Sequence, residues 1–217
     1  TSISPDDAWG LTLWDKAECR DKLTAQRSGD LYTPPSLIGT ITPGIGQLNW
    51  GGAAFDPASN LLIAPVTKIP RYLRLIPVSE VDPELLKSAM AGMPSGIPGR
   101  IEGTDYTASY GPLLSSFGVP CIAPPWGELV AVDLAEAEIK WRVPLGSIEK
   151  LAPFSLPLNW GTQVAGGPII TASGLIFIGA TADEKFRAFD LDSGEELWKV
   201  TTPTASMATP MTYEIDG

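Results

Sequence analysis

The most regular pattern of hydrophobic and polar positions in the chain runs from Gly166 to Val200, GGPIITASGLIFIGATADEKFRAFDLDSGEELWKV. Runs of β-branched, aromatic or alternating residues are separated there by small or polar turn formers. The pattern predicts four strands, at Pro168–Ala172, Leu175–Ala180, Phe186–Asp190 and Glu196–Val200. Four consecutive strands joined by short turns form an antiparallel meander, and such a sheet is the blade of a β-propeller.

Parts of this pattern recur elsewhere, which is what a propeller requires. The opening half recurs in Gly51–Pro65, and a third opening strand is expected from Thr209. The closing half recurs in Gly127–Val143. In both closing halves an Ala, an Asp and a Trp have the same mutual spacing: Ala131, Asp133 and Trp141 in one, and Ala188, Asp190 and Trp198 in the other. We expect the Asp and the Trp to tie each sheet to its neighbour, with both Trp side chains packed.

The repeats predict an all-β fold, a single partial propeller domain of four-stranded antiparallel blades over residues 1–217. Residues 28–45 are assigned to the end of a preceding blade, with two strands around Pro34-Pro35. The other assignments are a blade at 46–145 interrupted by an insertion at 66–126, a complete blade with its leading loop at 146–203, and a truncated first strand at 204–217. The chain is therefore expected to be a piece of a larger propeller.

The insertion is far longer than an ordinary connecting loop, and such segments are usually functional or disordered. It contains a predicted short helix at 81–90, with Asp82 as N-cap and Pro83 in the first turn. Its basic residues are Lys68, Arg71 and Arg74. They either line a mouth for an anionic substrate or lie on a solvated loop.

Aromatic residues outside the repeats are interpreted mainly as packing residues. Trp9 and Trp14 are expected to anchor a core, because aromatic side chains dominate buried area. The stretch 146–162 is interpreted as a covering loop. It contains Asn159-Trp160 and has no chemical signature of its own.

Composition narrows the function classes. The 217 residues carry a formal net charge of −10, which repels nucleic acid and anionic membrane surfaces. The 22 Gly and 21 Pro suit a turn-dense β protein, and no apolar run approaches the roughly 20 residues that span a bilayer. The chain contains no His, so a zinc site or a His general base within it is excluded.

The two cysteines, Cys19 and Cys121, are too far apart in sequence for a CxxC motif. They form either a structural disulfide or two unrelated buried thiols. The acidic, Lys-poor composition is typical of a secreted protein and favours the disulfide.

The segment Gly46–Pro57, GQLNWGGAAFDP, has the greatest chemical interest. Glycines on both sides of Asn49-Trp50 allow the backbone to approach a ligand closely, and an Asn side chain both donates and accepts hydrogen bonds to a quinone or carboxylate. The alternative is a Gly-rich entry to a blade with a buried Trp.

Seven segments resemble, in the same order, the C-terminal part of the membrane-bound pyrroloquinoline-quinone (PQQ) dependent sugar and polyol dehydrogenases, the glucose and quinate/shikimate dehydrogenase group. They are AWGLTLWDKAECR, LYTPPSLIGTI, NWGGAAFDP, FGVPCIAPPWG, GGPIITASGLIFIGATAD, RAFDLDSGEELWK and ATPMTYEIDG. The resemblance implies an eight-bladed propeller with PQQ and a calcium or magnesium ion on its axis. It also implies a periplasmic location, with electrons passing to membrane ubiquinone.

The resemblance places few functional residues in this chain. The catalytic Asp and most metal and cofactor ligands of the family precede Thr1, so no catalytic or metal-binding residue is assigned here. Asn49 matches the position of an Asn beside PQQ, and Trp50 is at most a supporting neighbour. Both cysteines match cysteines of the glucose dehydrogenase branch, which strengthens the disulfide interpretation. Departures from the family occur at Ala64-Pro65, which replaces an Asn of some members, and at the turn 135–137, which lacks the usual Gly.

We therefore expect a fragment of a periplasmic quinoprotein dehydrogenase that oxidises a sugar or polyol and is inactive alone. Its partners would be the remainder of the propeller, the substrate and ubiquinone, and nucleic acid is not expected. The alternative is a non-enzymatic propeller scaffold of the outer-membrane assembly type, which shares the blade pattern.

Overall fold

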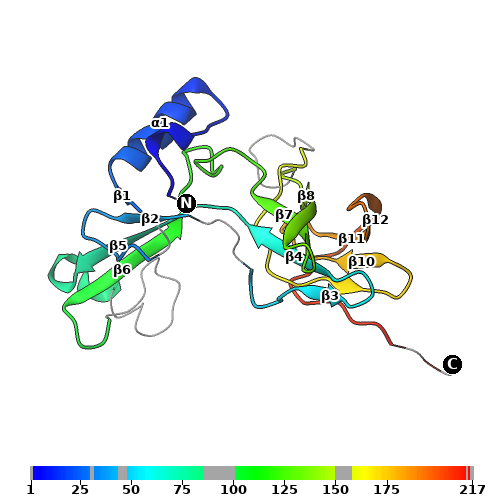
Figure 1. The fold of residues 1–217 in the computed structure, drawn as a ribbon. Helices are drawn as coiled ribbons and strands as arrows, with labels where there is room; N and C mark the ends of the chain where they lie inside the picture. Colours follow the sequence, from blue (N-terminus) through cyan, green and yellow to red (C-terminus); the bar gives the residue numbers. More distant parts are fainter. Residues whose placement is uncertain are drawn as a thin grey trace. The chain divides into compact units, whose positions relative to one another are not determined.

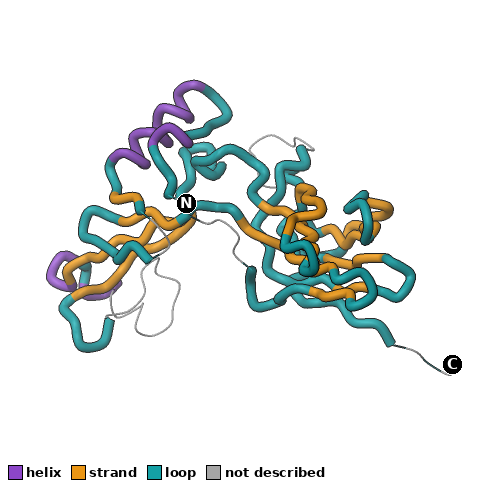
Figure 2. The backbone as a smooth tube through the Cα atoms, in the orientation of Figure 1, coloured by secondary structure: helices purple, strands orange, loops and turns teal. Residues whose placement is uncertain are grey.

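The computed structural model describes residues 2–29, 32–43, 48–85, 101–149, 158–213 and 215. Strands account for most of their regular structure, as the tube in Figure 2 shows. The chain divides into two compact units. The first comprises Thr1–Gly44 and Ile69–Ala123, and the second comprises Ile45–Lys68 and Pro124–Gly217.

The second unit contains the predicted meander. Its strands are β9 (Ile169–Ile170), β10 (Leu175–Ile178), β11 (Lys185–Asp190) and β12 (Glu196–Thr201). They lie in the order β12-β11-β10-β9, and every neighbouring pair is antiparallel (Figure 1). All four predicted strands are confirmed, although β9 is shorter than expected.

A second antiparallel sheet in this unit has the order β3-β4-β7-β8. Its strands are β3 (Ala54–Asp56), β4 (Leu61–Thr67), β7 (Gly127–Asp133) and β8 (Glu138–Pro144). The sheet unites two segments that the long insertion separates in sequence. The predicted recurrence of the pattern is confirmed in register, because Trp141 pairs with Ala131 just as Trp198 pairs with Ala188.

Alternation along these strands builds the core of the second unit. Leu61 and Ile63 on β4, Leu129 on β7 and Ile176 and Ile178 on β10 have no exposed surface. Leu61 and Ile63 are two residues apart in β4, as are Ile176 and Ile178 in β10, so the two members of each pair face the same side of their sheet. The two sheets share one apolar cluster, which holds them together.

The two repeated Trp residues differ in environment. Trp141 donates a hydrogen bond from Nε1 to the carbonyl of Leu191 at 3.0 Å. Its ring lies so close to Gly194 that a Cβ there would come within 2.6 Å. Trp141 thus ties β8 to the neighbouring sheet, as predicted. The same prediction is wrong for Trp198 in this structure, because its side chain is 49% exposed and no described sheet lies beyond β12.

The repeated aspartates act within their own sheets. Asp190 Oδ1 accepts hydrogen bonds from the backbone N–H groups of Asp192 and Ser193, at 3.1 and 2.8 Å. Asp133 Oδ1 does the same for Ala135 and Glu136, at 2.9 and 3.1 Å. Each Asp stabilises the turn that follows it, so the expectation that it ties neighbouring sheets is wrong.

The first unit contains a sheet that the sequence analysis did not predict. Its order is β1-β2-β5-β6, with β1 parallel to β2 and the other pairs antiparallel. The strands are β1 (Arg27–Ser28), β2 (Thr40–Thr42), β5 (Arg71–Pro77) and β6 (Tyr106–Pro112). The hairpin β5–β6 therefore gives the long insertion a regular structure, completed by N-terminal residues.

Of the two strands predicted around Pro34-Pro35, only β2 is found, and part of the first lies outside the described residues. The strand predicted from Thr209 does not form in residues 209–213, because no described strand pairs with it. Two short 3₁₀-helices, η1 (Pro5–Asp7) and η2 (Val78–Glu80), flank these elements.

Helix α1 (Leu13–Thr24) covers part of the first unit. Thr12 caps the helix, because its side chain accepts a hydrogen bond from the backbone N–H of Asp15 at 3.1 Å. Cys19 and Leu23 are buried on one side of the helix. The prediction that Trp14 anchors a core is wrong: its side chain is 84% exposed, whereas Trp9 is half-buried. The predicted cap by Asp82 is present, since Oδ1 accepts the N–H of Glu84 at 2.7 Å, but most of that helix lies outside the described residues.

A disulfide joins Cys19 on α1 to Cys121, and their Cα atoms are 5.1 Å apart. The prediction of a disulfide is therefore confirmed. Both cysteines are fully buried within a cluster that also includes Leu23, Ile41 and Leu113. The bond attaches the helix covalently to the segment that follows β6.

Candidate functional site at the start of strand β3

A tight turn brings Asn49 to the start of β3. The carbonyl of Asn49 accepts the N–H of Gly52 at 3.0 Å, and its side-chain Oδ1 accepts the N–H of Trp50 at 2.8 Å. Gly52 has a φ of 68°, which suits glycine and explains its place in the turn. The turn holds Asn49 five residues before Ala54, the first residue of β3, and the Asn49 side chain is exposed.

The donor side of the Asn49 carboxamide is lightly used. Its Nδ2 lies 3.5 Å from the carbonyl oxygen of Val164, at the limit of a hydrogen bond. The adjacent Trp50 side chain is 71% exposed. An exposed amide N–H beside an exposed indole is able to donate a hydrogen bond to an oxygen of a planar ligand.

The starts of successive repeats converge beside this turn. A Cβ on Gly51 would come within 2.2 Å of the backbone N of Gly167, so the two chains pass in direct backbone contact. Thr209 joins them, because its Oγ1 accepts the N–H of Gly167 at 3.2 Å and donates to the carbonyl of Gly51 at 3.3 Å. The residues that open three repeats therefore meet at one place.

This convergence indicates which strands are innermost. β3 and β9 are the first strands of their sheets, and they contact one another within the second unit. In a propeller, the first strands of adjacent blades face the central channel. On that basis Asn49 is predicted to lie near the inner edge of the propeller. A role in cofactor binding stays a prediction.

The three basic residues of the insertion do not form one cluster. Lys68 forms an ion pair with Glu128, with Nζ and Oε2 3.3 Å apart. Arg71 and Arg74 are three residues apart in β5, so their side chains project from opposite faces of the sheet. The interpretation as a solvated loop is wrong for both arginines, since they lie in a strand.

The most buried charges in the second unit are Asp183 and Arg187, with 1% and 3% of their side chains exposed. Asp183 accepts hydrogen bonds from the N–H of Ser147 at 2.8 Å, from Thr181 Oγ1 at 2.6 Å, and from Arg187. Burial acts to raise the pKa of Asp183, but these hydrogen bonds and the Arg187 charge outweigh it and hold the pKa below its ordinary value. The group is inaccessible and ties Ser147 to the β10–β11 turn, so its role is structural.

Two further sequence predictions concern metals and the covering loop. Within the described ranges, no three His, Cys, Asp or Glu side chains are grouped so that they could hold a metal ion. In the loop that contains Asn159, the Trp160 ring meets Trp126 edge to face, with centroids 5.8 Å apart. Trp160 therefore packs on the second unit, while Asn159 is exposed.

The profile of the family described as "PQQ: Glucose/ethanol/alcohol dehydrogenase, beta-propeller domain" matches residues 1–217. The chain belongs to this family. Its two sheets in the second unit are accordingly part of a β-propeller. Because the match extends over the first unit, the sheet β1-β2-β5-β6 falls within the same family domain.

Individual relatives of this PQQ propeller family include two bacterial dehydrogenases. The chain is 39% identical over 223 residues to quinoprotein glucose dehydrogenase of Escherichia coli (strain K12), covering 99% of this chain and 28% of that protein. It is 32% identical over 219 residues to quinate/shikimate dehydrogenase (quinone) of Acinetobacter baylyi, covering 98% and 27%. The chain thus spans little more than a quarter of these relatives.

Among solved structures, quinohemoprotein alcohol dehydrogenase from Comamonas testosteroni is similar to this chain with a TM-score of 0.48 and 23% identity. The similarity covers 78% of this chain and 21% of that chain. No helix among the described residues has the length and hydrophobicity needed to cross a bilayer.

Proposed function

We propose that this chain forms part of the propeller of a periplasmic PQQ-dependent dehydrogenase that oxidises a sugar or polyol of the glucose or quinate/shikimate type. The observation that carries the proposal is the exposed Asn49 at the converging starts of the repeats, in a chain that matches the family over residues 1–217. Ubiquinone is the proposed electron acceptor, by analogy with membrane-bound members of the group.

The residues at the start of β3 fit one edge of the cofactor. Asn49 would donate a hydrogen bond from Nδ2 to a carbonyl or carboxylate oxygen of PQQ, since that nitrogen has only a long contact to Val164. Trp50 would act through Asn49, whose Oδ1 holds its backbone N–H. PQQ, when bound, supplies the two-electron acceptor for alcohol oxidation.

The described residues do not fit the metal in the same way, since no three of their His, Cys, Asp or Glu side chains are grouped so that they could hold an ion. The calcium or magnesium ligands and the catalytic Asp would therefore come from other residues of the complete protein. The chain alone is proposed to be inactive, and its contribution is to form part of the wall beside the cofactor.

A matched pair of substitutions tests the Asn49 assignment. Asn49→Ala in the complete polypeptide should weaken PQQ binding about 5- to 100-fold, the loss of one hydrogen bond in a partly desolvated site. Asn159→Ala is the control, because Asn159 is also exposed and also precedes a Trp. PQQ titration monitored by absorbance gives the affinities, and thermal unfolding checks the folds.

The outcomes separate the alternatives. Unchanged PQQ affinity in Asn49→Ala would contradict the cofactor role and leave a Gly-rich blade entry as the explanation. A complete polypeptide that neither binds PQQ nor reduces a dye with glucose or quinate would contradict the enzyme assignment itself. That result would favour the non-enzymatic scaffold of the outer-membrane assembly type.

A further inference from the structure

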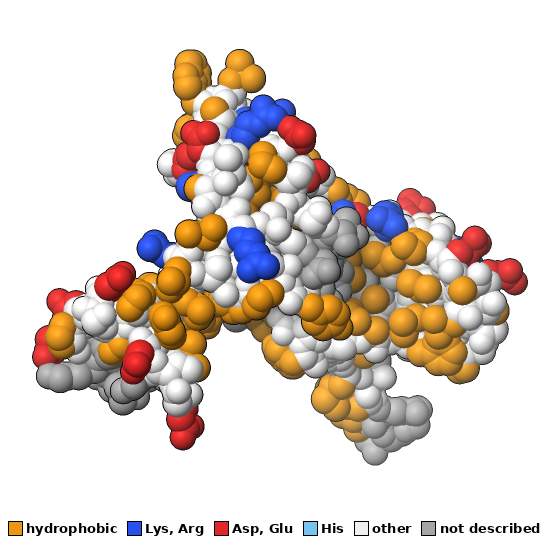
Figure 3. Space-filling model, turned by 60° about the vertical axis from the view of Figure 1, so that its left-hand side comes forward, with side chains coloured by type: hydrophobic (Ala, Val, Ile, Leu, Met, Phe, Trp, Pro, Cys, Tyr) orange, Lys and Arg blue, Asp and Glu red, His pale blue; other side chains and the backbone are white. Residues whose placement is uncertain are grey.

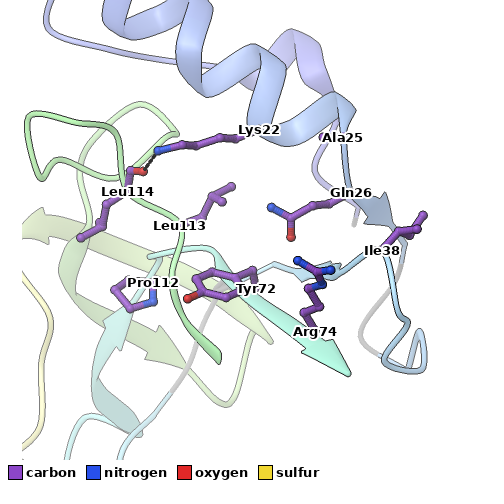
Figure 4. A pocket seen from close by; sticks show the side chains of 9 residues that line it. All are labelled: Lys22, Ala25, Gln26, Ile38, Tyr72, Arg74, Pro112, Leu113 and Leu114. Atoms are coloured by element: carbon purple, nitrogen blue, oxygen red, sulfur yellow. Dashed lines mark hydrogen bonds between the residues drawn. The ribbon is translucent and has the colours of Figure 1, made fainter. Parts of the chain in front are cut away.

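The first unit contains a cavity of about 380 Å³ that none of the residues assigned to PQQ lines. Figure 4 shows its walls, which come from four parts of the unit. Lys22 and Gln26 belong to the end of α1 and the residues after it, and Ile38 precedes β2. Tyr72 and Arg74 belong to β5, and Leu113 follows β6. The volume lies in the range of small-molecule binding sites.

Two of these walls are held together before any ligand binds. The disulfide joins α1 to Cys121, whose N–H donates to the carbonyl of Leu113 at 3.0 Å. Lys22 Nζ donates to the carbonyl of Leu114 at 2.8 Å (Figure 4). The cavity is therefore preformed, and a ligand would not have to order its walls.

The floor of the cavity carries the guanidinium group of Arg74. Tyr72 and Arg74 are two residues apart in β5, so both project from the same face of the sheet. Arg74 uses Nε to donate to the carbonyl of Leu37 at 3.0 Å. Among the described residues, no carboxylate pairs with its guanidinium, whose two terminal nitrogens remain available as donors. Such a group binds carboxylates preferentially.

The other cation of the cavity is already neutralised. Lys22 Nζ lies 2.6 Å from Glu18 Oε1, so the pair contributes no net charge. The net positive charge beside the cavity is thus the single charge of Arg74. A monoanion matches it better than a dianion or a neutral molecule.

An unsatisfied acceptor lies opposite Arg74. Gln26 Oε1 is buried and has no hydrogen-bond partner, and Figure 4 shows the Gln26 carboxamide turned toward the guanidinium. Gly39 is packed against it, since a Cβ there would come within 2.8 Å of Oε1. A buried acceptor without a partner is costly, and a hydroxyl group on a ligand would satisfy it.

We propose that this cavity binds a small amphipathic organic acid. Its carboxylate would accept hydrogen bonds from Arg74, its hydroxyl group would donate to Gln26 Oε1, and its apolar ring would lie against Tyr72 and the leucines after β6. The site rests on the geometry of the first unit and does not depend on the proposed dehydrogenase function.

Binding is tested with 4-hydroxybenzoate, which carries one carboxylate, one ring and one hydroxyl group. Isothermal titration of the complete polypeptide should give saturable binding at one site. Benzoate lacks the donor for Gln26, and 4-hydroxybenzamide lacks the charge. Each should bind about tenfold more weakly than 4-hydroxybenzoate, as expected when a hydrogen bond to a charged or buried group is lost.

Substitutions on the two faces of β5 test the location. Arg74→Gln should weaken the binding of 4-hydroxybenzoate about tenfold, so that 4-hydroxybenzoate and 4-hydroxybenzamide bind with the same affinity. Arg71→Gln is the matched control, because it removes the same charge from the opposite face of the same strand and should leave affinity unchanged. In Gln26→Leu, 4-hydroxybenzoate should bind no more tightly than benzoate. Circular dichroism establishes that each variant is folded.

Three results would overturn the proposal. The first is no saturable binding by the folded polypeptide, as expected if other residues of the complete protein fill the cavity. The second is an equal loss of affinity for 4-hydroxybenzoate in Arg71→Gln and Arg74→Gln, which would indicate a general charge effect. The third is equal affinity for all three probes, which would indicate non-specific apolar binding.

Discussion

The turn between the last two strands of each blade demands an unusual backbone conformation at one residue. Ala137 has a φ of 57° between β7 and β8, and Gly194 has a φ of 72° at the equivalent place between β11 and β12. A left-handed conformation is strained for Ala and free for Gly. The same turn position is therefore optimised in one blade and strained in the other.

Exchanging the two residue types should have opposite effects. Ala137→Gly should raise the free energy of unfolding by up to about 1 kcal/mol, because relief of the strain exceeds the added flexibility of the unfolded chain. Gly194→Ala should lower it by more than 1 kcal/mol, since its Cβ would press on the Trp141 ring at 2.6 Å. Urea denaturation measures both. If Ala137→Gly lowers the free energy of unfolding, the conformation of Ala137 is not strained.

The buried pair Asp183 and Arg187 makes stability depend on pH. The pKa of Asp183 is lowered from 3.8, so its contribution is complete above that value and is lost as the pH falls through the folded-state pKa. Asp183→Asn should cost about 3 kcal/mol at pH 7, because it removes the buried carboxylate partner of Arg187 and leaves only the partly exposed Glu196, whose Oε2 is 3.0 Å from Nε. The difference between wild type and variant should narrow below pH 3.8.

Urea midpoints at pH 7 and pH 3 check this expectation. Asp192→Asn is the control, since its exposed pair with Lys140, at 3.2 Å, should contribute less than about 1 kcal/mol. A difference between wild type and Asp183→Asn that stays constant across the two pH values would show that Asp183 is not the titrating group.

At the scale of elements, the sequence predicted what is locally encoded. The meander β9–β12 was predictable because turn formers separate short apolar runs, and its repeat was predictable because Ala, Asp and Trp recur at fixed spacing. The hairpin β5–β6 was missed because 28 residues separate its strands, and because β5 also pairs with the N-terminal strand β2 from outside the insertion. Only the folded chain reveals such pairing.

Helix α1 was missed although a local signal existed. Thr12 and Asp15 have the spacing of an N-terminal cap, and good helix formers follow them. The two aromatic residues at 9 and 14 drew the interpretation toward a buried core. The position of Asn49 shortly before a first strand was predictable from the glycines around it. The cavity beside α1 was not predictable, since its walls come from four segments that are distant in sequence.

The equivalent Trp residues give a prediction at this scale. Trp141→Ala should destabilise the 217-residue chain by about 3 kcal/mol, because it removes both the Leu191 hydrogen bond and the packing on Gly194. Trp198→Ala should cost about 1 kcal/mol or less, since this side chain is half-exposed and contacts Phe186 of its own sheet.

The two Trp substitutions also test whether β12 is covered in the complete protein. In this structure Leu197, Trp198 and Val200 of β12 are exposed hydrophobic residues. Figure 3 shows that hydrophobic side chains reach the surface at several places. If the two Trp substitutions cost the same in the complete protein but not in this chain, another sheet covers β12 there. Equal costs in the 217-residue chain itself would contradict the half-exposed environment of Trp198.

At the scale of the whole molecule, stability is distributed over two units with different supports. The second unit relies on an apolar cluster shared by two sheets, and on the buried ionic group at Asp183. The first unit has a smaller cluster, and the disulfide lies inside it. A crosslink contributes most where the core is small and the closed loop is long.

Removal of the disulfide should therefore affect the units unequally. The bridge joins residues 102 apart in sequence, and the double variant Cys19→Ser with Cys121→Ser should lose up to about 4–5 kcal/mol in the chain-entropy model. Hydrogen exchange should accelerate in α1 and in the residues after β6, because these are the segments that the bond joins. Strands β9–β12 should keep their protection, since their core lies in the second unit. Equal acceleration in both units would mean that they unfold as one cooperative body, and the loss of the disulfide would then reach the start of β3 as well.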